Sequence, residues 1–238
     1  TRYRGTESKR ERDALAVEEP LEIRVSWLEG GKKRIEPLAV TMRTPGNDFE
    51  LVAGFLHGEG LIATTDQLHE LSYCTGPDEQ EYNVVEAKLA AGVAFDPESV
   101  KRNFYATSSC GVCGKASLDA VQARGCALLA PGLTVDAALV PQLPDRLLEA
   151  QGVFERTGGI HAAGIFTGTG ERLVVMEDVG RHNAVDKVIG HQLMQRALPA
   201  SDDVLVVSGR ASFEVVQKAV AAGLPILVAV GAPSSLAV

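Results

Sequence analysis

Two cysteines three residues apart, Cys110 and Cys113, lie in the stretch ATSSCGVCGKAS and are the residues best suited to chemistry. A CxxC pair can supply two ligands to a zinc ion, close a redox-active disulfide, or present one thiolate for group transfer. A glycine follows each cysteine, and Lys115 comes directly after the second glycine. The surrounding residues and the rest of the chain distinguish between these three uses.

Zinc chemistry has little support in the residues around the pair. Tetrahedral zinc needs about four ligands, and the remaining cysteines, Cys74 and Cys126, are isolated. Zinc nucleoside deaminases combine a PCxxC with an upstream HxE. Here a serine precedes Cys110, and the comparable triplet, which begins at His161, lacks the glutamate and follows the cysteines. We therefore predict no metal site and no deaminase activity.

The two thiol chemistries differ in the local structure that they require. A thioredoxin-like dithiol begins a helix directly after a buried strand, and the preceding NFYATSS is a weak, polar-ended strand candidate. After the pair, GKASLDAVQARG (114–125) has apolar residues at helical spacing and ends on a glycine. A helix N-terminus and a lysine lower the pKa of a thiol from about 8.5 toward neutrality. The dithiol remains an alternative.

The remaining use of the pair is a nucleophilic thiolate for group transfer. The polar Ser-Ser-Cys-Gly context argues against buried, inert cysteines, and the flanking glycines leave room for a donor protein. A thiolate of this kind can attack the outer sulfur of another protein's persulfide and carry that sulfur onward. We predict Cys110, Cys113 and Lys115 as the catalytic group.

The last third of the chain alternates between strand and helix. Strands at 160–166 and 171–179 are predicted to form a hairpin. After them we expect helices at 181–194 and 212–223 and strands at 203–209 and 224–230. This order is typical of an α/β layer arrangement. The apolar runs VLVV and ILVAV predict a sheet that is covered on both faces.

Polar residues follow three of these strands, in EDVGRHN (177–183), SGRAS (208–212) and GAPSS (231–235). Loops that leave parallel strands meet at one edge of an α/β sheet, where ligands bind. Helix starts with nearby arginines hold phosphate groups, although such residues most often only cap helices. With the histidine of TGGIHAAG, the candidate cofactor-binding residues are His161, Arg181, His182, Asn183, Ser208, Arg210, Ser212 and Ser234.

One pair within the first junction has two further interpretations. His182 and Asp186 lie four residues apart and share a helix face. They could form an acid–base or metal pair, or a solvated helix cap with an i,i+4 contact. No Walker A loop or GxGxxG fingerprint is present.

The first half of the chain predicts a smaller α+β lobe. Residues 1–19 are highly charged and are expected to form a mobile arm. We expect two strands, at 21–28 and 33–43, joined by a turn at Gly30–Gly31. A helix within 46–62 and a strand at 81–90 should follow. That helix should be capped by Asn47 or Asp48 and end near Gly58 or Gly60. A further helix is expected at 143–154. We place the smaller lobe at 20–105 and the CxxC loop with the α/β domain at 106–238.

Composition narrows the class of partner. The 238 residues carry 23 Lys and Arg against 31 Asp and Glu, a formal net charge of −8. Without a basic stripe, we expect no duplex nucleic acid as a partner, because that affinity comes from Lys and Arg neutralising phosphates. No apolar run reaches the roughly 18 residues of a membrane span, and no signal peptide opens the chain. We expect a cytoplasmic protein without membrane contact.

Five stretches of the chain together resemble one known family. They are ELVAGFLHGEGLI, SSCGVCGKAS, TGGIHAAG, EDVGRHNAVDKVIG and SGRASFEVVQKAVAAGLPILVAVGAPSSLAV. The combination resembles the formate dehydrogenase accessory sulfurtransferase family, FdhD, from about residue 20 to residue 238. The combination is far more specific than a CxxC pair by itself.

The resemblance implies a sulfurtransferase with named partners. Members take persulfide sulfur from a cysteine desulfurase and pass it to the molybdenum bis-molybdopterin guanine dinucleotide cofactor that formate dehydrogenase needs. By resemblance, Cys110 carries the persulfide and Cys113 is its partner. The family binds that cofactor as an acceptor, or GDP in its place, and has no permanently bound cofactor. A cytidine deaminase-like α/β domain, a smaller α+β lobe and a homodimer are implied.

Two alternatives and one departure accompany the resemblance. The protein could instead be a cofactor-binding chaperone for formate dehydrogenase without sulfur chemistry, or a dithiol reductase. The family is expected to continue past APSSLAV with a helix and a strand that carries a GF…R segment, whereas this sequence stops at Val238. The resemblance therefore implies that part of the cofactor site is missing from the sequence.

Overall fold

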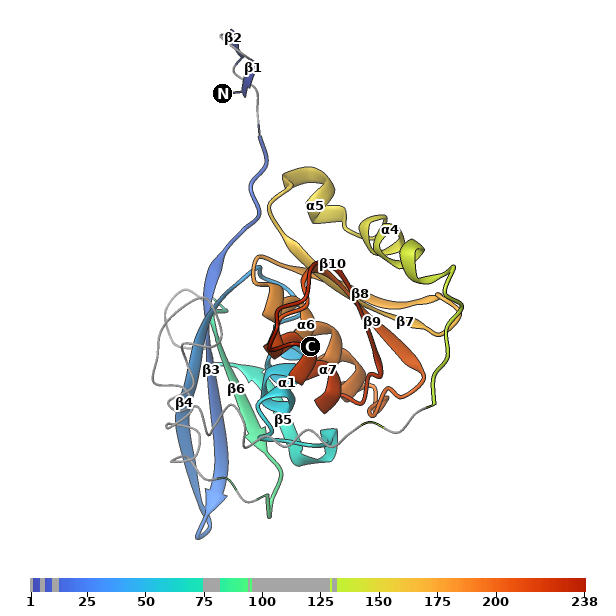
Figure 1. Ribbon diagram of the computed structural model, residues 1–238. Coiled ribbons are helices and arrows are strands. Elements are labelled where there is room, and N and C mark those ends of the chain that lie inside the picture. The colour runs from blue at the N-terminus through green and yellow to red at the C-terminus, as the bar shows by residue number, and fades with distance from the viewer. Residues whose placement is uncertain are drawn as a thin grey trace.

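Two four-stranded sheets with helices between and around them form the molecule (Figure 1). The computed structural model describes residues 2–4, 7–9, 13–74, 82–93, 95, 129 and 132–238. Cys110, Cys113 and Lys115 lie outside the described residues, as do the predicted helix at 114–125 and the predicted boundary between lobe and domain at residue 105. Those expectations stay predictions.

The first sheet is built from residues of the N-terminal half. Its strands are β3 (Glu19–Glu29), β4 (Lys32–Arg43), β5 (Leu68–Tyr73) and β6 (Val84–Leu89), in the order β4-β3-β6-β5. The predicted hairpin is confirmed, and Gly30 and Gly31 turn it with φ values of 58° and 77° that favour glycine. The strand predicted at 81–90 is confirmed as β6.

Several short elements were not predicted. β1 (Arg2–Arg4) pairs with β2 (Glu7–Lys9), and the single turn η1 (Thr65–Gln67) leads into β5. β5 escaped prediction because its sequence, LHELSY, places exposed polar residues beside apolar ones without a clear alternation. Strand pairing across the sheet, rather than local pattern, makes this segment a strand.

Helix α1 (Asp48–Gly58) covers the inner face of the first sheet. Its predicted start and end are confirmed, with Asn47 at the N-cap position. Leu51 and Leu56 are buried in one apolar cluster with residues of β3 and β6. Asp48 is also buried, because its carboxylate accepts two hydrogen bonds from the Arg43 guanidinium, at 3.1 and 3.0 Å. This pair fixes the helix to the end of β4.

The second sheet carries the three polar junctions. Its strands are β7 (His161–Thr167), β8 (Arg172–Asp178), β9 (Asp203–Arg210) and β10 (Ile226–Gly231), in the order β10-β9-β7-β8. β7 runs antiparallel to β8 and β9, and β10 runs parallel to β9. The C-terminal ends of β8, β9 and β10 therefore lie at one edge, together with the start of β7.

Both faces of this sheet are covered, as predicted from its apolar strands. On one face Val204 and Val206 pack in a cluster with Leu143 and Leu147 of α4 (Leu143–Leu148), which follows the turn η3 (Val140–Gln142). On the other face Leu205 packs with residues of α6 (Arg181–Met194) and α7 (Phe213–Ala221). The mixed α/β class is confirmed, whereas the cytidine deaminase-like layering stays a prediction.

The helix predicted at 143–154 is wrong as a single element. The chain instead forms α4 and a second short helix, α5 (Gly152–Thr157). The carboxylate of Glu177 accepts the backbone N–H groups of Val153 and Phe154, at 2.9 and 2.8 Å. A carboxylate that accepts these free N–H groups stabilises the start of a new helix. The contact from Glu177 of β8 therefore splits the predicted helix into α4 and α5.

The two halves meet where α1 crosses α6 between the sheets (Figure 1). Gly54 of α1 and Gly190 of α6 lie at the crossing, and a Cβ on either would overlap backbone atoms of the other helix. The helices can therefore approach this closely only because both residues lack a side chain. Among the described residues, no helix has the length and apolar character needed to cross a membrane.

Candidate functional site

The edge of the second sheet brings together residues from β7, β9 and α6. The Oγ of Ser208 lies 3.5 Å from Nδ1 of His161 and accepts a 2.9 Å hydrogen bond from the backbone N–H of Ala162. A Cβ on Gly209 would stand 3.8 Å from Cδ of Arg181 and 3.9 Å from Nδ1 of His161. The glycine thus leaves the space between these two side chains open.

A second group lies where α6 and α7 begin. Nε2 of His182 is 3.5 Å from Oγ of Ser212 and 3.8 Å from a carboxylate oxygen, Oε2, of Glu214. Ser212 is the N-cap of α7, and Glu214 is in the first turn of that helix. Sequence reasoning missed Glu214, although an acidic residue two positions after the SGRAS junction was a signal that could have identified it.

Burial sets the protonation of both histidines. Desolvation, together with the nearby positive charges of Arg181 and Lys218, lowers the pKa of His182 to about 4. Burial and Arg181 also lower the pKa of His161. At neutral pH His182 is therefore an uncharged imidazole, and the positive charge at this edge comes from arginine.

Two polar atoms in the site lack a hydrogen-bond partner among the described residues. They are Nε of Arg181 and Oε1 of Glu214, and both are buried. Buried polar atoms are almost always paired in native proteins, so an unmade donor and an unmade acceptor at one edge indicate a place for a ligand. Arg210 at the end of β9 is exposed and adds a second positive charge.

The third junction lies beside the second. Gly231 at the end of β10 is in register with Arg210, and the backbone N–H of Ser234 donates a 3.1 Å hydrogen bond to the carbonyl of Ala211. The three polar junctions therefore meet at one edge, as their positions after parallel strands predicted. His161, Arg181, His182, Ser208, Arg210, Ser212 and Ser234 all belong to this edge.

Asn183 differs from the other candidates. Its amide nitrogen donates to the carbonyl of Met42 at 2.8 Å and to Asp178 at 3.0 Å, and its amide oxygen accepts from the hydroxyl of Thr41 at 3.1 Å. These contacts use both donors and the acceptor of the side chain. The structure thus gives Asn183 a role in joining α6 to β4.

The i,i+4 relation between His182 and Asp186 does not produce a pair. Asp186 is buried and accepts a 2.6 Å hydrogen bond from Lys218 of α7, while His182 faces Ser212 and Glu214. The alternative of a solvated cap is wrong, because Asp186 is only 3% exposed. Across the described residues, no three His, Cys, Asp or Glu side chains gather in a group that could hold a metal ion.

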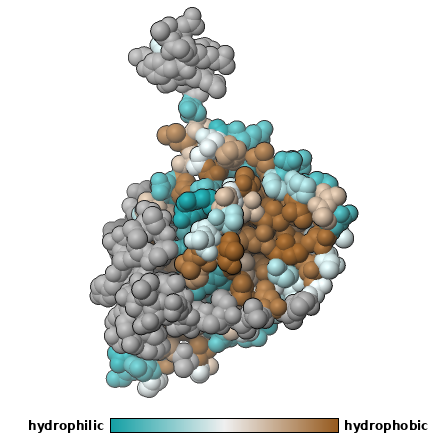
Figure 2. All heavy atoms as spheres, in the orientation of Figure 1, coloured by the Kyte–Doolittle hydropathy of each residue, from teal (hydrophilic) through white to brown (hydrophobic). Residues whose placement is uncertain are grey.

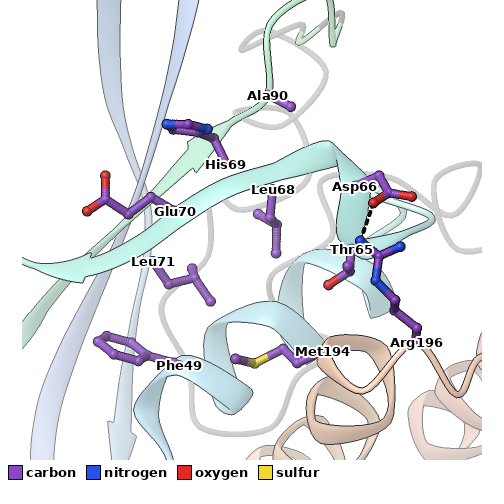
Figure 3. A pocket seen from close by; sticks show the side chains of 10 residues that line it. All are labelled: Phe49, Thr65, Asp66, Leu68, His69, Glu70, Leu71, Ala90, Met194 and Arg196. Carbon is purple, nitrogen blue, oxygen red and sulfur yellow. Dashed lines mark hydrogen bonds and ion pairs between the residues drawn. The ribbon is translucent and has the colours of Figure 1, made fainter.

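A pocket of about 450 Å³ lies elsewhere, between β5 and the end of α6 (Figure 3). Phe49, Leu71 and Met194 supply apolar lining, and Figure 3 shows Asp66 and Arg196 turned toward each other at one side. Their side chains form an exposed 2.6 Å ion pair. None of the candidate site residues lines this pocket, so it is separate from the sheet edge.

Comparisons with known proteins agree closely with one another. The family model described as FdhD/NarQ matches residues 16–238. A sulfur carrier protein FdhD of Streptomyces avermitilis is 54% identical over 231 residues, which cover 95% of this chain and 79% of that protein. Sulfur carrier proteins FdhD of Mycobacterium tuberculosis and Anaeromyxobacter dehalogenans are 52% and 48% identical, over 95% of this chain and 82% and 79% of theirs.

A solved structure shares the fold. It is a crystal structure of a candidate formate dehydrogenase accessory protein from Desulfotalea psychrophila, with a TM-score of 0.69 and 23% sequence identity. The match covers 99% of this chain and 82% of the other. At this level of identity the likeness establishes the architecture alone.

Proposed function

Because the chain belongs to the FdhD/NarQ family, we propose that it is a sulfur carrier that serves the maturation of formate dehydrogenase. The observation that carries this proposal is the set of relatives named as sulfur carriers, 48–55% identical over about 95% of the chain. The CxxC pair of the sequence supplies the chemical group that such a role requires.

The proposed acceptance step is a thiol–persulfide exchange. The thiolate of Cys110 attacks the outer sulfur of a persulfide on a cysteine desulfurase. A new sulfur–sulfur bond forms on Cys110, the donor's sulfur–sulfur bond breaks, and the donor cysteine leaves as a thiolate. Lys115 stabilises the attacking thiolate, and Cys113 assists or resolves the persulfide.

The acceptor that we propose is the molybdenum bis-molybdopterin guanine dinucleotide cofactor, bound as a substrate. The sheet edge fits its guanine nucleotide part, because Arg181 offers an unpartnered buried donor and Arg210 an exposed positive charge. Ser208 and His161 border the open space over Gly209. These residues would bind and orient the nucleotide, and the sulfur chemistry itself would belong to the cysteines.

We also propose that the protein is a cytoplasmic homodimer. Figure 2 shows apolar surface around the C-terminal segment and over the sheet that contains β9 and β10, where Val230 is 61% and Leu236 is 64% exposed. Contiguous apolar surface of this kind is typical of protein interfaces.

Sulfur loading tests the proposal directly. The full chain is incubated with a cysteine desulfurase and cysteine, and its intact mass is measured with and without a reductant. We expect a reducible mass increase of one sulfur atom that disappears in Cys110→Ala. A bound sulfur that survives when Cys110 and Cys113 are both replaced by alanine would contradict the assignment, and Cys74→Ala is the matched control.

The two alternatives give different results. If the protein were a chaperone without sulfur chemistry, its Cys110→Ala variant would still restore formate dehydrogenase activity in cells. A dithiol reductase would form a stable Cys110–Cys113 disulfide and reduce insulin-like substrates. For a sulfur carrier, we expect that Cys110→Ala does not restore formate dehydrogenase activity and that the wild-type protein does not reduce insulin-like substrates.

A further inference from the structure

The pocket of about 450 Å³ beside β5 runs along the free edge of that strand. Consecutive residues 68–71 all line it, although successive side chains of a strand point to opposite faces of the sheet. Figure 3 shows the two leucines, Leu68 and Leu71, on one side of β5, and His69 and Glu70 on the other. Since only a hollow alongside the strand contacts both sets, the pocket is open to a chain that lies next to β5.

The backbone of β5 can hydrogen-bond to such a chain. Among the described strands β5 pairs with β6 alone, at the end of the sheet. The N–H of Cys74 donates to the carbonyl of Val84 at 2.9 Å, and only alternate residues of an antiparallel pair bond across the ladder. The N–H and C=O groups of Leu71 and Tyr73 therefore point away from β6. Unpaired groups of this kind on an edge strand are a template for a further strand.

The same edge has an apolar surface. Phe49 of α1, Leu71 of β5 and Met194 at the end of α6 line the pocket, and Figure 3 shows these three side chains on one side of β5. Met194 is 38% exposed. A strand added to β5 directs alternate side chains toward this surface, so the pocket favours an apolar side chain there.

A positive charge lies at one end of the pocket. Arg196 follows α6 with a φ of 59°, a left-handed conformation that costs energy for a residue with a side chain. Its Nη2 donates to Asp66 at 2.6 Å, and its other side-chain N–H groups have no partner among the described residues. The Arg196 and Asp66 side chains are 66% and 68% exposed, and exposed ion pairs are weak. The guanidinium can therefore bind a second carboxylate.

We propose that this pocket and the edge of β5 bind the C-terminal peptide of a partner protein whose last residue is apolar. A chain terminus carries an apolar side chain and a carboxylate on one residue, and Met194 and Arg196 require both at the same place. Asp66 and Arg196 lie at the start of β5, so the peptide runs antiparallel to that strand. The pocket shares no residue with the edge of the second sheet.

The first test measures the role of the carboxylate by fluorescence anisotropy on the full chain. The probe is a fluorescein-labelled peptide, Gly-Thr-Lys-Val-Thr-Val-Leu, with a free carboxylate or an amide at its C-terminus. We expect the acid to bind roughly threefold to tenfold more tightly than the amide, the effect of one exposed ion pair or slightly more. Arg196→Gln should remove this difference. Arg172→Gln, an exposed change in β8, is the matched control and should retain it.

The second test measures the added strand. Replacing one backbone N–H of the probe by an ester oxygen removes a single donor, and only alternate N–H groups of an added strand face β5. We expect esters at alternate positions to weaken binding roughly threefold to tenfold, the effect of one hydrogen bond. Esters at the positions between them should have little effect.

Three results would overturn the proposal. They are an absence of saturable binding of the acid to the wild type, equal wild-type affinities for acid and amide, and ester effects without an alternating pattern. The last two do not depend on the folding of any variant. A dimer that Arg196→Gln dissociates in sedimentation would also overturn it, because the pocket would then hold a second copy of this chain. Sulfur loading should be the same in wild type and Arg196→Gln, so failure of the peptide site leaves the sulfur carrier standing.

Discussion

At the scale of single residues, burial moves the pKa values of two neighbours on α6 in opposite senses. Desolvation lowers the pKa of His182 to about 4 and raises the pKa of Asp186 to about 6. In both cases the folded protein disfavours the charged form. The two groups therefore have opposite effects on stability as the pH falls through the mildly acidic range.

We predict that His182→Gln becomes more stable relative to wild type as the pH falls. The unfolded chain protonates His182 near its ordinary pKa of about 6.5, while the folded protein resists protonation down to about 4. Stability from the neutral histidine is complete above about pH 6.5 and is lost toward pH 4. Between about pH 7 and about pH 4.5 the variant should gain about 2 kcal/mol on wild type in urea denaturation.

Asp186 does not disturb this comparison. Its raised pKa adds stability as the pH falls through about 6, because the folded state then binds the proton more tightly than the unfolded chain does. That contribution is present in both proteins and cancels in their difference. A difference that is the same at both pH values would refute the burial argument for His182.

At the scale of elements, two glycines determine how closely α1 and α6 pack. Gly54 and Gly190 lie at their crossing, and neither has room for a Cβ. The crossing places the start of α6, and with it Arg181 and His182, against the end of β4. Packing at one end of the helix thus positions side chains at the other.

We predict that Gly190→Ala destabilises the protein by about 2–3 kcal/mol or more, because overpacking forces the helix backbones apart. In an ordinary helix interior the same change adds up to about 1 kcal/mol of stability. Urea denaturation measures the loss. Gly152→Ala at the start of α5 is the matched control, since a Cβ there meets no atom within 4 Å. Equal stabilities of the two variants would contradict the close crossing.

At the scale of the whole molecule, a buried polar network joins the two sheets. Asp178 is fully buried and pairs with Lys187 at 2.7 Å, and it accepts the backbone N–H of Thr44 at 3.1 Å. Lys187 also donates to the carbonyl of Thr44 at 2.9 Å. Asn183 links the same carboxylate to Met42. Residues at and after β4 are thereby fixed to the edge that carries the site.

We predict that replacing Asn183 lowers mainly the stability of the fold, whereas replacing Arg181 lowers mainly the affinity for GDP. Asn183→Ala leaves buried partners unpaired and should lower the free energy of unfolding by about 1–3 kcal/mol. Its effect on GDP affinity should be small. Arg181→Met should weaken GDP roughly tenfold or more through loss of a charged donor. Calorimetry and urea denaturation on both variants test this, and equal losses of affinity would restore Asn183 as a ligand residue.

The sequence by itself determined the local elements and much of the candidate site. Paired glycines located the first hairpin, and apolar runs bounded by polar junctions located β9 and α6. Parallel strands followed by polar loops were enough to predict that Arg181 and Ser208 meet at one edge. The local elements depend on neighbours within a few residues, which the sequence displays directly, and the meeting of the junctions follows from the shared direction of the strands before them.

Only the tertiary structure decided the partners that lie far apart along the chain. Glu177 divides a predicted helix, Lys218 pairs with Asp186, and Asn183 binds β4. Sequence spacing cannot show which buried charge meets which, because burial and pairing arise when distant elements pack. For the same reason Glu214 emerged as a site residue only when its unpartnered oxygen was seen beside His182.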